Sequence, residues 1–308
     1  MSGISGMVSV TTTTREREQT RAAHAVYAAL FGLAVACGRS PDTVVVGSKN
    51  FSESILLGEI VAQQLERYGV PVERRFNLGG FLCHQGLVEG KIDVYVEYTG
   101  TAHAAILKLP AERDPQRVRQ QVDSVYRERF GVVWSDGLGF ENTFAILVRR
   151  RDAERLGIRT ISDAVPHMRK WRPAFGYEFT ERADGFRALA QAYGIELERQ
   201  PVNMELGLVY RALADGLGDF SSGNSTDGQI AALDLFMLED DRRFFPPYEA
   251  APVVRQEVLE RHPEVARALR TLGGTITGER MRELNRLVDV EQRPLREVAQ
   301  EFLEAVPR

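Results

Sequence analysis

Cysteine is scarce in this chain, which has only Cys37 and Cys83 among its 308 residues. The fold is therefore expected to rely on its hydrophobic core and not on a disulfide framework. His84 follows Cys83 directly, but adjacent residues on a helix point in different directions, so the pair is weak evidence for a cysteine nucleophile. We expect Cys83 to be a small buried thiol.

Signatures of catalysis and of metal binding are also missing. The sequence has no P-loop, zinc-finger spacing, HExxH pattern, nucleophile elbow or dinucleotide fingerprint. Four histidines without metal-ligand spacing are expected at the surface or at helix caps: His84, His103, His167 and His262. Asp93 and Glu97 lie four residues apart in a predicted strand, about 13 Å from each other at ~3.3 Å per residue, which is too far for a glycosidase pair. We therefore predict no enzyme activity, no cofactor and no metal.

An excess of positive charge is absent as well. The 39 basic and 43 acidic residues give a formal net charge of −4, and no run of four or more basic residues follows the first 40 residues. This balance argues against a nucleic-acid-binding protein, which would need a strongly basic face. With 44% hydrophobic and 27% charged residues the composition is ordinary for a soluble globular protein. The length fits two domains better than one, because single cores seldom grow much past about 250 residues.

The first 42 residues differ from the rest. Three arginines precede an apolar run at 22–36, which is too short for a transmembrane helix of about 20 apolar residues. The arrangement predicts a secretory signal over 1–36. The segment Ala34-Val35-Ala36-Cys37 resembles the lipobox of bacterial lipoproteins, which implies a lipidated Cys37 followed by a linker at 37–42. The alternative is a buried N-terminal helix with an incidental cysteine.

From residue 43 onward, short apolar runs alternate with amphipathic segments. Strands are predicted at 43–46, 72–77, 92–97, 132–134, 144–148 and 174–177, and helices at 57–68, 82–89, 116–130, 185–193 and 206–214. The last sixty residues are predicted to be largely helical. Asn50 and Glu53 have the spacing of a capping box. The alternation predicts two open, mostly parallel α/β sheets covered by helices.

Polar residues follow two of the predicted strands. Ser48-Lys49-Asn50 comes after the first strand, and the segment 97–101 comes after the third. Ligands of open α/β sheets sit beyond the carboxyl ends of the strands, near helix N-termini. Sequence patterns alone thus predict a two-lobed α/β protein with a polar and aromatic cleft.

Five longer motifs occur in a fixed order. They are GSKNFSE at 47–53, NLGG at 77–80, GKIDVYVEYTGTA at 90–102, STDG at 225–228 and LEDDRRFFPPY at 238–248. Together they resemble the glycine betaine/choline (osmoprotectant) family of ABC-transporter substrate-binding proteins, over about 43–303. The resemblance implies a type II periplasmic-binding-protein fold, with one lobe from 43–142 plus 243–308, the other from 143–242, and chain crossings near 141–143 and 242–246. It also implies a monomeric solute-binding lipoprotein at the outer face of the membrane, served by permease and ATPase subunits.

The same resemblance implies a two-part ligand site. A trimethylammonium group cannot donate hydrogen bonds and is held by the negative faces of aromatic rings. The positions that match the family's cation cage are Tyr98, Phe144, Asn224 and Tyr248. The positions that match its carboxylate contacts are Lys49, Thr101 and Arg182. An arginine can hold a carboxylate through two parallel hydrogen bonds.

Two cage positions depart from the family pattern, which has tyrosines there. Phe144 keeps a ring face and loses only a hydroxyl, whereas Asn224 has no ring at all. One wall of the cage is therefore expected to be polar or open. Tyr210, in a predicted helix, could occupy the gap.

Alternative functions stay open at this point. The same fold could bind a different small zwitterion, or could present its ligand to a receptor as a sensor or adaptor. An enzyme is the third alternative. Saturable binding without turnover would separate a binding protein from an enzyme, and genes for a permease and an ATPase nearby would separate a transporter subunit from a sensor.

Overall fold

The computed structural model describes residues 42–79, 81–182 and 185–307. The predicted signal at 1–36, the predicted lipidation at Cys37 and the linker up to residue 41 lie outside the described residues. Within the described part of the chain, no helix is both long enough and apolar enough to span a membrane.

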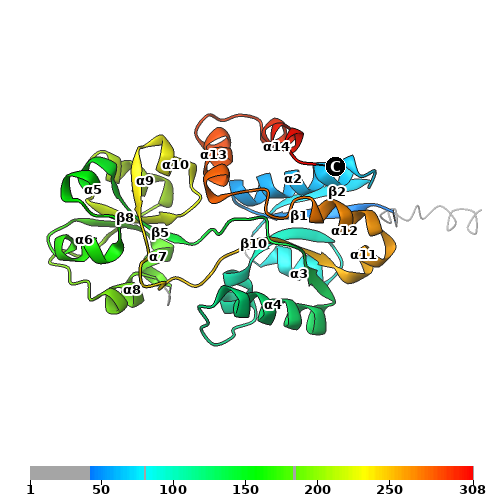
Figure 1. The fold of residues 1–308 in the computed structure, drawn as a ribbon, viewed down its shortest axis with the longest axis horizontal. Helices are drawn as coiled ribbons and strands as arrows, with labels where there is room; N and C mark the ends of the chain where they lie inside the picture. Colours follow the sequence, from blue (N-terminus) through cyan, green and yellow to red (C-terminus); the bar gives the residue numbers. More distant parts are fainter. Residues whose placement is uncertain (1–41, 80, 183–184, 308) are drawn as a thin grey trace, which may run out of the picture. The chain divides into compact units, whose positions relative to one another are not determined.

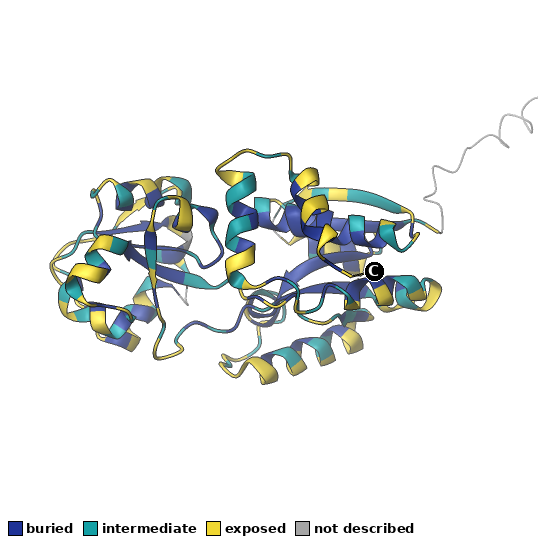
Figure 2. Ribbon diagram, turned by 45° about the horizontal axis from the view of Figure 1, so that its top comes forward, coloured by how far each residue is buried: buried dark blue, intermediate teal, exposed yellow. Residues whose placement is uncertain are grey.

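The first sheet has five strands in the order β2-β1-β3-β10-β4. These are β2 (Val72–Leu78), β1 (Val44–Lys49), β3 (Val94–Tyr98), β10 (Ala250–Arg255) and β4 (Val132–Trp134). Successive side chains of a strand point to opposite faces, so Val44 and Val46 enter one core and Val45 enters another. β1 and β3 are almost entirely buried, as expected for strands covered on both faces (Figure 2).

Helices cover both faces of this sheet (Figure 1). The core that contains Val44 is closed by α2 (Ser52–Arg67), α11 (Gln256–Arg261), α12 (Pro263–Arg270), α13 (Gly278–Asp289) and α14 (Leu295–Glu304). The core that contains Val45 is closed by α3 (Leu82–Val88), the short π-helix η1 (Thr101–Ile106) and α4 (Pro115–Phe130). Cys83 is fully buried in the second of these cores, as predicted.

The second sheet also has five strands, in the order β7-β6-β8-β5-β9. These are β7 (Val202–Met204), β6 (Pro173–Gly176), β8 (Phe220–Asn224), β5 (Phe144–Arg149) and β9 (Leu235–Leu238). One face packs on α5 (Arg150–Leu156), α6 (Ile161–Met168), α7 (Tyr177–Glu181) and α8 (Phe186–Tyr193). The other packs on α9 (Leu206–Ala214) and α10 (Gly228–Ala232).

The prediction of mostly parallel sheets is wrong. In each sheet two of the four strand pairings are parallel and two are antiparallel. The antiparallel pairings all involve β5 or β10 (Figure 1). Each of these is the first strand after the chain passes from one sheet to the other, and it enters against the direction of its neighbours.

Two local predictions are also wrong. α2 has Phe51 at its N-cap and no side-chain capping bond, so Asn50 and Glu53 do not form a capping box. The Glu53 carboxylate is instead buried and accepts hydrogen bonds from other elements. His103, expected at the surface or at a cap, is buried and pairs with Gln121 through Nε2 at 2.7 Å.

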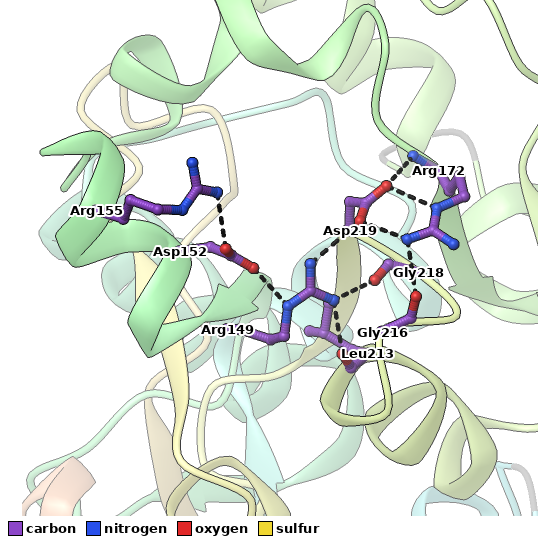
Figure 3. A network of polar contacts seen from close by, with 8 residues as sticks. All are labelled: Arg149, Asp152, Arg155, Arg172, Leu213, Gly216, Gly218 and Asp219. Atoms are coloured by element: carbon purple, nitrogen blue, oxygen red, sulfur yellow. Dashed lines mark hydrogen bonds and ion pairs between the residues drawn. The ribbon is translucent and has the colours of Figure 1, made fainter.

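A polar network ties the second sheet to the loop after α9 (Figure 3). The Arg149 guanidinium donates to Asp152, to Asp219 and to the backbone oxygens of Leu213 and Gly218. Asp219 also accepts two side-chain hydrogen bonds from Arg172, at 2.9 and 2.8 Å. The guanidinium groups of Arg149 and Arg172 thus bind backbone carbonyls of this loop together with the Asp219 carboxylate, which fixes the loop that leads into β8.

Candidate functional site

One cavity of about 430 Å³ is lined by all seven residues that the family resemblance implies for ligand binding. They are Lys49, Tyr98, Thr101, Phe144, Arg182, Asn224 and Tyr248. The side chains come from separate elements of both sheets, chiefly from strand ends, the place where open α/β sheets hold ligands. The structure therefore brings the whole predicted set together, while the part that each residue plays toward a ligand stays a prediction.

Two aromatic rings of the cavity already face positive charge. The Lys49 ammonium lies 5.2 Å from the centre of the Tyr98 ring, and the Arg182 guanidinium lies 5.2 Å from the centre of the Phe144 ring. Arg182 Nη2 also donates to the Tyr248 hydroxyl at 2.8 Å. Cations at this distance are attracted by the ring quadrupole, so both faces are electrostatically suited to a positively charged group.

Lys49 is held in place by a buried carboxylate. Its ammonium pairs with Glu97, which also accepts from the Tyr95 hydroxyl at 2.9 Å and from the Tyr98 backbone N–H at 2.7 Å. Only 13% of the Lys49 side chain is exposed. The lysine is thus a fixed cation of the cavity wall and not a solvated surface residue.

Glu53 is the main residue of the cavity that sequence reasoning missed. Its Oε1 accepts from the Tyr98 hydroxyl at 2.6 Å and from Asn142 Nδ2 at 2.9 Å, and its Oε2 accepts from Asn285 Nδ2 at 2.7 Å. Burial raises the pKa of the Glu53 carboxyl, although these hydrogen bonds oppose the rise. The carboxyl joins α2, β3, α13 and the segment between β4 and β5 at the wall of one cavity.

Asn224 stands beside a second acidic residue of the cavity, Asp227. The Asp227 carboxylate accepts from the Tyr210 hydroxyl and, at 3.4 Å, from the backbone and side-chain N–H groups of Asn224. Burial raises the pKa of Asp227 to about 6, and the Glu53 and Asp289 carboxylates add to the rise. Tyr210 itself is buried beneath β8 and is not among the residues that line the cavity, so it does not replace the missing ring.

Weak signals in the sequence pointed to the missed residues. Asn285 lies four residues after Met281 on the apolar face of α13, and a polar side chain there calls for a buried partner. Asn142 lies two residues before the predicted cage residue Phe144. Glu53 lies within the first motif, but its spacing from Asn50 suggested helix capping instead.

Within the described ranges, no group of three or more His, Cys, Asp and Glu residues could hold a metal ion. The cavity offers aromatic faces, two cations and several carboxyl groups. Such a site suits a small molecule that carries both charges.

Comparison with known proteins identifies the family. Residues 42–305 match the family described as the substrate binding domain of ABC-type glycine betaine transport systems. A carnitine transport binding protein of Listeria monocytogenes serotype 1/2a (strain 10403S) is 35% identical over 271 residues, which are 87% of this chain and 88% of that protein. A Helicobacter pylori (strain G27) protein named ergothioneine transport permease/ergothioneine binding protein is 35% identical over 265 residues, or 85% of this chain. Those residues are 47% of that protein, so the chain spans about half of its length.

Solved structures agree with this assignment. A crystal structure described as a glycine betaine/carnitine/choline ABC transporter has a TM-score of 0.81 and 31% sequence identity, over 85% of this chain and 97% of that chain. The predicted α/β class, the two-lobed periplasmic-binding-protein fold and the family resemblance are confirmed. Proteins of this family are extracytoplasmic components without enzyme activity, which bind small solutes and work with permease and ATPase subunits. The chain belongs to the substrate-binding domain family of ABC-type glycine betaine transport systems.

Proposed function

We propose that the chain binds glycine betaine or a related quaternary ammonium zwitterion and delivers it to an ABC importer. The observation that carries the proposal is the single cavity lined by all seven residues of the predicted site. Carnitine and ergothioneine, the compounds named for two relatives, belong to the same chemical class. Each has a trimethylammonium group and a carboxylate.

The cavity supplies a partner for each charge. Tyr98, Phe144 and Tyr248 present ring faces to the trimethylammonium group, and each ring contributes roughly 0.5–2 kcal/mol depending on desolvation. Asn224 forms the fourth, polar wall. The Glu53 and Asp227 carboxyls add negative potential on the cation's side when they are ionised.

The carboxylate of the ligand binds Arg182, Lys49 and Thr101 in this proposal. Arg182 contacts both Phe144 and Tyr248, so an acid group bound by Arg182 is held next to two rings of the cage. A carboxylate that draws Arg182 toward itself also takes the guanidinium off the Phe144 face. That face then becomes available to the trimethylammonium group of the same ligand.

Closure around the ligand follows the two chain crossings in this proposal. The lobes are 43–142 with 243–308, and 143–242, and the crossings at 141–143 and 242–246 act as the hinge. Asn142, in the first crossing, donates a hydrogen bond to Glu53 in the cavity wall. A movement of Glu53 on ligand binding therefore acts directly on the hinge.

Calorimetry with glycine betaine, choline, carnitine, ergothioneine, proline betaine and ectoine tests the proposal. We expect saturable binding of at least one zwitterion in the micromolar to millimolar range. Choline, which lacks a carboxylate, should bind more weakly than glycine betaine. Flat heats for every compound would refute the assignment. Binding without uptake by the cognate permease and ATPase would favour a sensor that presents its ligand to a receptor.

The membrane anchor is a separate part of the proposal. The lipobox-like segment before Cys37 supports acylation of this cysteine after removal of residues 1–36. Cells fed a labelled fatty acid should incorporate the label into the wild-type protein, and a Cys37→Ala variant should lose it. Equal labelling of both proteins would overturn the proposed site of attachment.

A further inference from the structure

The STDG motif at 225–228 connects β8 to α10, and of its four residues only Asp227 lines the ligand cavity. The motif lies in the proposed lobe 143–242, whereas α13 lies in the proposed lobe 43–142 with 243–308. α13 nevertheless packs more extensively on α10 than on α2 or α14 (Figure 1). The motif and α13 are therefore a place where the two lobes meet outside the chain crossings.

Ser225 fixes the start of the motif to the first chain crossing. Its backbone N–H donates to the Thr143 carbonyl at 2.8 Å. Its hydroxyl donates to the Glu141 carbonyl at 3.2 Å and accepts from the Thr143 N–H at 3.1 Å. Arg282 of α13 donates to the Ser225 carbonyl at 3.0 Å. This one buried residue therefore binds both the crossing and α13.

Asn285 of α13 extends this contact to the ligand cavity. Its Nδ2 donates to the Thr226 carbonyl at 2.8 Å and to Glu53 Oε2 at 2.7 Å. Asn285 and Thr226 are only 2% and 1% exposed, so water does not compete for these hydrogen bonds while the two surfaces stay together. Glu53 in turn accepts from the Tyr98 hydroxyl. A cage ring of one lobe is thus linked through two buried side chains to the backbone of the other lobe.

Gly228, the last residue of the motif, allows the closest approach. A Cβ at this position would lie 2.6 Å from Arg286 Cα and 2.8 Å from the carbonyl carbon of Asn285. The backbones of α10 and α13 therefore meet with no side chain between them. Because helix backbone cannot move aside as the end of a flexible side chain can, any larger residue at 228 must push α10 and α13 apart.

We propose that the STDG motif and α13 form a third, non-covalent hinge contact, which persists while the lobes rotate about it. The inference rests on the lobe closure in the proposed function, and it adds the element that holds the axis of this rotation. Two chain crossings side by side can twist as well as bend, whereas a third contact next to them leaves only the bend.

The contact positions one half of the ligand site against the other. The lobe 143–242 supplies Phe144, Arg182 and Asn224 to the cavity, and the other lobe supplies Tyr98 and Tyr248. A twist between the lobes would bring these two sets together in the wrong register. Gly228 and Asn285 are therefore positioning residues, which act on the ligand through the alignment of the lobes.

Distances between the lobes, measured without added ligand, test the inference. In a Cys37→Ala chain, spin labels are attached at Arg129→Cys on α4 and Arg151→Cys on α5, two exposed positions in different lobes. We expect pulsed electron spin resonance to give a narrow distribution of distances for this parent chain and a clearly broader one after Gly228→Ala. Equal widths would overturn the third hinge contact, whether or not the chain binds a betaine.

Two further variants make this measurement specific. Gly278→Ala is the matched control on α13, because its Cβ would meet only Arg282 Nη1, at 3.8 Å, and the narrow distribution should remain. Arg282→Ala removes one hydrogen bond across the contact and leaves Gly228 in place. It should broaden the distribution by less than Gly228→Ala does, and it decides the question if Gly228→Ala does not fold. An unchanged width in Arg282→Ala would then count against the contact.

Ligand affinity gives a second readout. If the lobes of Gly228→Ala are aligned for about a tenth of the time, every ligand should bind about tenfold more weakly, because the apparent affinity falls with the fraction of binding-competent protein. The order of affinities among the ligands should not change. A loss confined to one ligand would show that Gly228 acts on the cavity wall and not on the hinge. If the wild-type chain binds none of the compounds, the proposed function fails, while the distance measurement still decides whether the contact holds the lobes.

Discussion

Replacement of Asp227 by asparagine should raise the free energy of unfolding, and this gain should be larger at neutral pH than at acidic pH. In the folded protein, burial and the neighbouring carboxylates raise the pKa of Asp227 from its ordinary 3.8 to about 6. The folded state therefore keeps its proton when the unfolded chain has already lost it. Stability from this group is fully present below pH 3.8 and is lost as the pH rises toward 6.

The magnitude follows from the two pKa values. At 1.36 kcal/mol per pKa unit, the difference between 3.8 and about 6 amounts to about 3 kcal/mol of lost stability above pH 7. At pH 4.5 the same relation gives a loss of about 1 kcal/mol. An asparagine at 227 cannot ionise, and its amide oxygen can still accept from Tyr210 and Asn224. The advantage of the variant should thus grow by about 2 kcal/mol between pH 4.5 and pH 7.5.

Urea unfolding of wild type and Asp227→Asn at several pH values measures this difference directly. The exposed Asp136, replaced by asparagine, is the control and should show no comparable divergence. Parallel stability curves for wild type and Asp227→Asn across this pH range would refute the reasoning. They would mean that the carboxylate is as well solvated in the folded protein as in the unfolded chain.

Three further predictions concern binding, stability and reactivity. Arg182→Ala should weaken the binding of carboxylate ligands roughly 10–100-fold, because a hydrogen bond to a charged group contributes about 1.5–3 kcal/mol. The affinity for choline should fall by much less. Equal losses of affinity for both kinds of ligand in calorimetry would show that Arg182 does not bind the carboxylate. Asp219→Ala should lower the free energy of unfolding by about 1–3 kcal/mol near pH 7, because the arginine contacts hold the pKa of this carboxyl well below its usual range. The difference in unfolding free energy between wild type and this variant should shrink as the pH falls below 4. A difference that stays the same at every pH in urea unfolding would contradict the prediction. In a Cys37→Ala chain, Cys83 should not react with a thiol reagent until the protein unfolds, because burial raises its pKa to about 12; rapid labelling of the folded chain would contradict this.

Periodicity predicted the helices and strands whose residues follow a clear pattern. The apolar repeat that begins near Leu57 forms α2, and Gly69 follows it with φ of +80°, a conformation that favours glycine. β8 escaped prediction because its sequence is FSSGN, and serine and glycine have little intrinsic preference for strands. Neighbouring strands and the helices that cover them bury these residues nonetheless.

β10 was missed for a different reason. Pro252 lies in the middle of this strand, and proline in a central strand normally argues against a sheet. Here Pro252 lies opposite Val96, and its carbonyl accepts from the Ser135 backbone N–H at 2.9 Å. The missing N–H of the proline is tolerated because the strand pairs through its other residues.

The candidate site was predicted in part. The ordered motifs contain four of the seven predicted residues, namely Lys49, Tyr98, Thr101 and Tyr248, and Asn224 directly precedes the fourth motif. All seven line the cavity. The Glu53 cluster was not predictable by local spacing, since Asn285 lies 232 residues away along the chain.

The position of β10 between β3 and β4 has a consequence for biosynthesis. β10 is the last strand along the chain, yet it supplies the only partner that β4 has among the described strands. The second sheet, by contrast, is complete once β9 has been made. As the polypeptide leaves the ribosome or a translocation channel, its middle can therefore finish folding while the N-terminal half still waits for residues 250–255. A nascent chain stopped before residue 250 would keep one edge of β3 bare and open to pairing with other molecules.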